Sequence, residues 1–157
     1  MSDTIQDGVY RSEDYGFSIR FPAGWELRPG DGKNVVKQAF GPNRTGMNVV
    51  VTTSEGRAGE ADFADFFQSM EAALLRQLAG RLLQKSVGEI NGEQVGYMKI
   101  AAVLKTPNGN VDMIVQACLA RKGGIQYMLS AMAPADGFDD VNPVITDSFA
   151  TFTLENR

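Results

Sequence analysis

The chain has 157 residues, of which 43% are hydrophobic and 22% charged, as is typical of one globular domain. It contains no histidine and a single cysteine, Cys118. These counts exclude Ser-His-Asp and Cys-His nucleophile pairs, imidazole-ligated metals, internal disulfides and multi-cysteine clusters. The net charge of -4, without any basic run, argues against a nucleic-acid partner. We therefore expect no enzyme, no cofactor and no metal.

The N-terminus has neither a cationic start nor an apolar core, so we expect no signal peptide in the chain as given. The predicted location is the cytoplasm, or outside it if a leader was removed before Met1. Charges interrupt every apolar stretch well short of the roughly 20 residues that cross a bilayer. We expect a flexible tail over residues 1–8 and a single domain over residues 9–157.

Short strands are predicted first, at 9–11, 17–21, 25–27, 35–40 and 47–53, with turn-forming residues between them. From Asp62 the apolar residues recur at steps of three and four, which indicates an amphipathic helix. We expect about six turns of helix, ending near Gln84. The residues on its apolar face are Phe63, Phe66, Met70, Leu74 and Leu78.

An antiparallel meander follows, with strands at about 85–90, 93–105, 111–121 and 125–133. Its turns are indicated by Asn91-Gly92, Pro107-Asn108-Gly109 and Gly123-Gly124. Folding about these turns places Tyr97, Leu119 and Tyr127 on one face. It places Met98, Cys118 and Met128 on the other. Both faces are largely apolar, so each needs a cover.

A second helix is predicted from Asp139 to Phe149, with Pro143 in its first turn. The two helices would then cover the two faces of the meander. The expected fold is α+β, a three-layer α/β/α sandwich around a central antiparallel sheet.

The segment Tyr15-Gly16-Phe17-Ser18-Ile19-Arg20-Phe21-Pro22-Ala23-Gly24-Trp25 resembles the opening strand of the PsbP-like family. This family includes the photosystem II extrinsic protein PsbP, bacterial DcrB-type proteins and the yeast Ran-binding nuclear import factor. The resemblance extends from about Val9 to Phe152. It implies an α/β/α sandwich that binds other macromolecules and has no shared catalytic residues. No photosystem or Ran-binding residue is carried over.

Two groups of charged residues are candidate sites. Arg28, Lys33 and Lys37 surround a Gly-rich loop, where they would bind an acidic protein partner or form a solvated rim. Asp136, Asp139 and Asp140 would form a weak calcium site or cap the second helix.

Two further features have a structural and a functional interpretation. Met98, Cys118 and Met128 form a sulphur strip that suits a soft metal ion, although core packing is the favoured interpretation. Trp25 is interpreted as a core anchor, with a partner contact as the alternative.

The favoured function is a non-catalytic protein-binding or accessory domain of unknown oligomeric state. An alternative is a chaperone-type adaptor that shields an apolar segment of a secreted client, with the Met-rich sheet face as its adaptable surface. A carboxylate-only hydrolase comes last, because no pair of acids has a supporting spacing.

Overall fold

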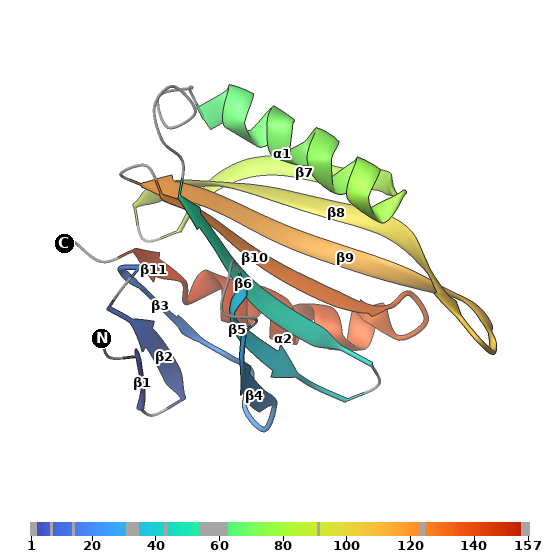
Figure 1. Cartoon of the computed structure of the whole chain (residues 1–157), viewed down its shortest axis with the longest axis horizontal. Coiled ribbons are helices and arrows are strands. Elements are labelled where there is room, and N and C mark those ends of the chain that lie inside the picture. The colour runs from blue at the N-terminus through green and yellow to red at the C-terminus, as the bar shows by residue number, and fades with distance from the viewer. Residues whose placement is uncertain are drawn as a thin grey trace.

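The computed structural model describes residues 3–6, 8–13, 15–30, 35–42, 44–53, 63–90, 92–122 and 125–154. Over these residues the chain forms eleven strands, in two antiparallel sheets, and two helices (Figure 1). The predicted α+β class is confirmed. The second sheet was not predicted, since the expected sandwich has one central sheet.

The larger sheet has seven strands. In spatial order they are β4 (Glu26–Pro29), β5 (Val35–Phe40), β6 (Gly46–Thr53), β10 (Ile125–Pro134), β9 (Gly109–Lys122), β8 (Glu93–Thr106) and β7 (Arg81–Ile90). The predicted meander therefore forms one half of this sheet, and the predicted strands at 25–27, 35–40 and 47–53 form the other half.

The smaller sheet has the order β1 (Asp3–Gln6), β2 (Val9–Ser12), β3 (Phe17–Arg20) and β11 (Thr153–Leu154). β1 pairs with β2 over its whole length, from Asp3 opposite Ser12 to Gln6 opposite Val9. The expectation of a flexible tail over residues 1–8 is therefore corrected at residues 3–6. The pairing of β11 with β3 adds the C-terminal end of the described chain to the sheet formed by its first strands.

The first helix, α1 (Phe63–Leu78), lies along one face of the larger sheet (Figure 1). The predicted start, Asp62, lies outside the described residues, and the helix ends well before Gln84. Ala79 adopts a left-handed φ of 49°, and the N–H of Gly80 donates to the carbonyl of Leu75 at 3.0 Å, which closes the helix end. Residues 81–90 then form β7.

Gly80 explains why the chain turns at this point. A Cβ at this position would lie 2.6 Å from Cγ2 of Ile100 and 2.8 Å from the carbonyl oxygen of Ala101. Only glycine permits this close approach to β8. The chain therefore leaves α1 directly into the edge strand of the sheet that α1 covers.

The predicted apolar face of α1 is confirmed. Phe66, Phe67 and Leu74 are buried against the sheet, and the other predicted members of the stripe are partly buried in the same cluster. The sheet residues buried beneath them are Met98, Ile100, Val115, Ala117 and Leu119.

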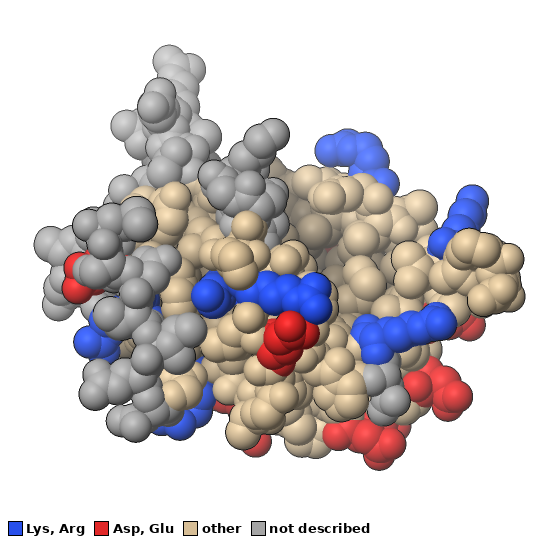
Figure 2. Space-filling model, turned by 60° about the horizontal axis from the view of Figure 1, so that its bottom comes forward, with Lys and Arg blue, Asp and Glu red and all other residues tan. Residues whose placement is uncertain are grey.

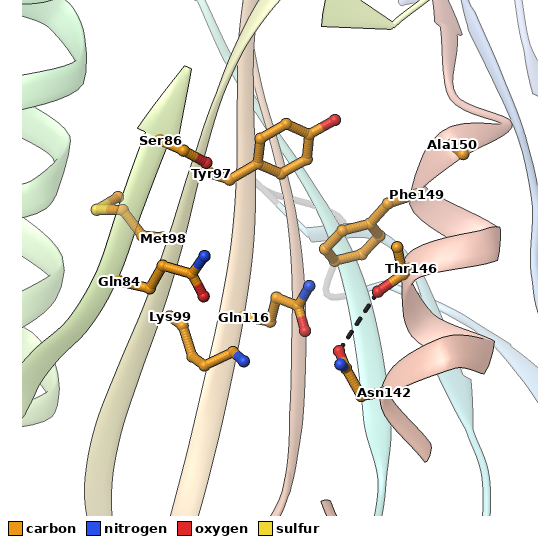
Figure 3. Close-up of a pocket in the computed structure, with 10 residues that line it drawn as sticks. All are labelled: Gln84, Ser86, Tyr97, Met98, Lys99, Gln116, Asn142, Thr146, Phe149 and Ala150. Atoms are coloured by element: carbon orange, nitrogen blue, oxygen red, sulfur yellow. Dashed lines mark hydrogen bonds between the residues drawn. The ribbon is translucent and has the colours of Figure 1, made fainter. Parts of the chain in front are cut away.

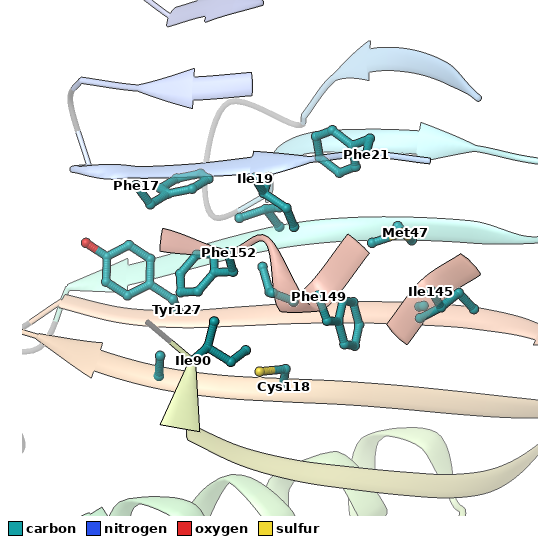
Figure 4. Packing of buried hydrophobic residues seen from close by; sticks show 14 of the residues in the cluster. Phe17, Ile19, Phe21, Met47, Ile90, Cys118, Tyr127, Ile145, Phe149 and Phe152 are labelled. Atoms are coloured by element: carbon teal, nitrogen blue, oxygen red, sulfur yellow. The ribbon is translucent and has the colours of Figure 1, made fainter. Parts of the chain in front are cut away.

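The second helix, α2 (Phe138–Ala150), packs on the opposite face, where Ile145 and Phe149 are buried. Pro143 lies inside this helix rather than in its first turn, where it was predicted. The smaller sheet packs into the same core as α2, and Figure 4 shows Phe17 and Phe152 beside Tyr127. The ring centroids of Phe17 and Tyr127 are 5.8 Å apart in an edge-to-face contact.

The register of β9 differs from the prediction by one residue. Tyr97 of β8 pairs with Cys118, rather than with Leu119, and Cys118 pairs in turn with Leu129 of β10. Because side chains alternate between the faces of a strand, a shift of one residue turns β9 over. Leu119 therefore packs beneath α1, and Cys118 lies on the α2 side.

Candidate functional site

The structure does not gather the three predicted cations into one patch. Arg28 pairs with Gln38, and Lys37 with Pro29, so the two cations lie on opposite faces of the β4–β5 ladder. Arg28 forms an exposed ion pair with Glu26 at 3.0 Å. Lys33 lies outside the described residues. On the face drawn in Figure 2, basic side chains are likewise scattered, without a continuous patch.

Lys37 has a structural contact instead. Its ammonium nitrogen lies 5.3 Å from the ring centroid of Tyr10, which belongs to the smaller sheet. The guanidinium of Arg28 lies 4.7 Å from the ring centroid of Phe40 on the outer face. Each cation therefore stacks on an aromatic ring, a contact that orders the side chain without any partner.

The three aspartates lie around the start of α2 and are all exposed. Asp136 and Asp140 line a hollow of about 260 Å³ beside Trp25, whereas Asp139 does not line it. Within the described part of the chain, no three acidic or cysteine side chains are grouped so as to hold a metal ion. The residue before the helix is Gly137, with φ 93°, and no side chain caps the helix start. The aspartates therefore act on the helix only through its dipole.

The predicted sulphur strip does not form. Met98 is buried beneath α1, where Met128 also packs, whereas Cys118 belongs to the core on the α2 side. The prediction failed because the strip required the register that β9 does not adopt. Burial raises the pKa of the Cys118 thiol to about 12, so the thiol stays protonated and is a poor nucleophile near neutral pH.

Trp25 is half-buried and packs against the main core. Its indole lies on the backbone of Gly41, where a Cβ would approach to within 2.4 Å of Cε2. This contact agrees with the predicted anchoring role. The indole also forms part of the wall of the hollow next to Asp136 and Asp140.

A free strand edge lies at the far end of β8. β7 begins at Arg81, opposite Ala101, but β8 continues to Thr106 and remains paired with β9 throughout. Residues 102–106 therefore have no described strand on their outer side. Figure 1 shows this β8–β9 hairpin projecting beyond α1. An unpaired strand edge presents backbone N–H and C=O groups that another strand can bind.

Apolar side chains accompany this edge. Val103 and Leu104 are 51% and 42% exposed, and Leu83 of β7 is 42% exposed. A groove of about 470 Å³ is lined by Leu83 and Val103, but not by Leu104, and its walls include Gly80, Ala102 and Ile114. The predicted strands at 85–90 and 93–105 already leave the far end of β8 without a partner on one side. The groove itself was not predicted, because residues from the turn after α1 and from β7, β8 and β9 form its walls and only the tertiary fold brings them together.

Neither described helix is long and apolar enough to cross a membrane. No protein-family sequence model and no curated protein sequence matches the chain. Similarity is found at the level of three-dimensional structure.

The solution structure of cyanobacterial PsbP (CyanoP) from Synechocystis sp. PCC 6803 superposes with a TM-score of 0.70 at 13% identity, covering 93% of this chain and 91% of that chain. The chain has the PsbP/Mog1-like fold. The Ran-binding protein Mog1p of Saccharomyces cerevisiae gives a TM-score of 0.62 at 10% identity, with 96% of each chain covered. A Pseudomonas aeruginosa protein of unknown function, described as a putative regulator, gives 0.61 at 14% identity, covering 95% of this chain and 97% of its own. The predicted resemblance is thus confirmed as a shared fold.

Proposed function

We propose that this chain is a non-catalytic accessory domain that binds an extended, apolar segment of a partner protein at the free edge of β8. The observation that carries the proposal is the stretch 102–106, which is paired on one side only and bears two exposed apolar side chains. Backbone pairing would supply affinity, and the groove would select side chains of the segment.

The similar structures support a binding role. Mog1p is described as a Ran-binding protein, and the other two similar proteins are described as a PsbP and as a putative regulator. The buried Cys118 and the absence of histidine leave few groups for covalent or acid–base catalysis at neutral pH.

The structure does not favour the chaperone alternative. That role needs the Met-rich sheet face as an adaptable surface, but Met98 is buried, and Met128 and Met132 pack in the same cluster under α1. A client would first have to displace the helix.

Site-specific photo-crosslinking in the native cells tests the proposal. A photoreactive residue replaces Leu104, and the cross-linked partner is identified by mass spectrometry. We expect a discrete adduct at this position that is lost when Val103→Asp introduces a charge beside the edge. The matched control is Val144→Asp on α2, where the valine is 39% exposed and does not line the groove.

The control variant should leave the adduct unchanged. Absence of an adduct at position 104, or equal adducts with both aspartate variants, would contradict binding at the β8 edge.

A further inference from the structure

A further pocket lies on the α2 side of the larger sheet, away from the edge of β8. It has a volume of about 260 Å³ and opens between α2 and strands β7, β8 and β9. Figure 3 shows the side chains of Gln84, Lys99 and Gln116 extending from the sheet, with Asn142 and Thr146 facing them from α2. Three strands and one helix thus supply the polar groups of one hollow.

The pocket has one charged residue in its lining, Lys99, and no acidic residue. Among the described residues, no carboxylate forms an ion pair with Lys99. Its ammonium nitrogen lies 5.2 Å from the ring centroid of Phe138, which holds the side chain on the α2 side of the sheet. An ammonium group held in this way, without a carboxylate partner, is a site for an anion.

The neutral polar groups of the pocket are not saturated by one another. The hydroxyl of Thr146 donates to Oδ1 of Asn142 at 3.3 Å, which leaves the Nδ2 donors of Asn142 available. Oε1 of Gln116 is shielded from solvent and has no hydrogen-bond donor. A buried acceptor without a donor is uncommon in a folded protein, and a water molecule or a ligand hydroxyl group can supply the missing donor. Gln116 belongs to the lining of the pocket.

The remaining lining is apolar and aromatic. Phe149 and Ala150 of α2 form one wall, and the ring of Tyr97 lies beside them (Figure 3). Burial raises the pKa of Tyr97, so its phenol stays neutral and does not repel an anion. Pockets for drug-sized ligands start at about 300 Å³, so this volume suits a smaller molecule with a single ring or a short chain.

We propose that this pocket binds a small hydroxylated carboxylate, of the size of a monosaccharide acid, with Lys99 and Asn142 donating to the carboxylate and Gln116 accepting from a hydroxyl group. One cation matches the single negative charge of a carboxylate, whereas a phosphate dianion would leave a charge unbalanced. A cationic ligand finds no acid in the lining. This site is separate from the β8 edge, so either proposal can fail alone.

Titration of the folded, isotope-labelled protein with D-glucuronate, D-gluconate and D-glycerate tests the proposal by NMR. D-glucose and D-glucosamine serve as the neutral and cationic counterparts of glucuronate. We expect saturable shifts at the lining residues of β7–β9 and α2 with at least one of the three acids. Glucose and glucosamine should bind at least tenfold more weakly.

The matched variants are Lys99→Gln and Lys105→Gln, which remove lysines from the same strand inside and outside the pocket. Lys99→Gln should weaken binding of the acid at least tenfold, and Lys105→Gln should leave it unchanged. If Lys99→Gln lowers the melting temperature of the parent protein, Asn142→Ala is used as the pocket variant in its place. The proposal is overturned if no acid gives saturable shifts at the pocket, if glucose binds as tightly as the acid, or if both lysine variants bind equally well.

Discussion

The two faces of the larger sheet are covered to different extents. Beneath α1 the sheet presents mainly apolar side chains, and Gly96 lets the ring of Phe67 approach the backbone, so that helix and sheet are in close contact there. Beneath α2 the part of the sheet formed by β7 and β8 carries Ser86 and Lys99, and a hollow remains. Apolar groups gain free energy by excluding water and polar groups do not. Both faces therefore contribute stability through their buried clusters, but the β7–β8 end of the α2 face leaves room for a ligand.

The largest expected effect comes from the α1 face. Phe67→Ala should lower the free energy of unfolding by about 3–5 kcal/mol, because the side chain is almost fully buried and leaves a cavity. Gln84→Ala, on the α2 face, should change it by less than about 0.5 kcal/mol, because the residue is exposed. Denaturant titration of both variants measures the difference, and equal losses would contradict the contrast between the faces.

Two glycines of the β7–β8 ladder sharpen the comparison. A Cβ at Gly96 would lie 2.8 Å from the ring of Phe67, whereas a Cβ at Gly88 would lie 3.4 Å from the ring of Tyr97. Gly96→Ala should therefore cost about 1–3 kcal/mol through overpacking. Gly88→Ala should change the free energy of unfolding little. The added methyl group comes only into near-normal contact with Tyr97, and alanine reduces the conformational freedom of the unfolded chain, which offsets this small cost. Thermal melts of the two variants check this, and a melting temperature lowered equally in both would count against tight packing beneath α1.

The third prediction concerns Cys118 and the pH dependence of stability. Its pKa is raised by burial to about 12, so the unfolded chain, with a thiol pKa of roughly 8.5, releases the proton first. Raising the pH from roughly 8.5 towards 12 should therefore lower the free energy of unfolding, by at most about 1.4 kcal/mol per pH unit for this group.

Denaturant titrations at several pH values measure this slope. Tyr97, whose pKa is also raised, acts in the same direction at higher pH, so Cys118→Ala is the necessary comparison. The variant should be less stable at pH 7 but have a shallower alkaline slope. An unchanged slope in the variant would show that the thiol is accessible in the folded state.

The sequence predicted the strands and the α1 face well because these depend on local periodicity. It failed at the register of β9, because a turn of three residues was assumed at Pro107-Asn108-Gly109, whereas Thr106 pairs directly with Gly109 across two residues. This difference of one residue places Cys118 on the opposite face. A second error of one residue at the next turn brings the total shift to two residues, so that Tyr97 aligns with Leu129 rather than with Tyr127. Because a shift of two residues keeps the same face, Tyr97 and Tyr127 do share a face as predicted.

Two other predictions from the sequence were wrong because tertiary packing, which the local sequence does not show, decides the outcome. Leu82 and Leu83 continue the helical spacing of α1, but the close approach of Gly80 to β8 ends the helix before them. The candidate sites were missed for a similar reason. Lys99 and Asn142 belong to separate elements, and only the packing of α2 on the sheet brings them to one pocket. No local pattern contains that information.

The pairing of β11 with β3 determines when the fold can be completed. The N–H of Arg20 donates to the hydroxyl of Thr151, 131 positions away in the chain, and the hydroxyl of Ser148 donates to the carbonyl of Arg20. A contact between residues so far apart closes a long loop of chain. The conformational entropy lost in closing this loop must be offset before the contact stabilises the fold. The hairpins of β7 to β10 close short loops and can form early. During synthesis, β3 can pair with β2 at once, but it must wait for its second neighbour, β11, until Thr153 and Leu154 have been made.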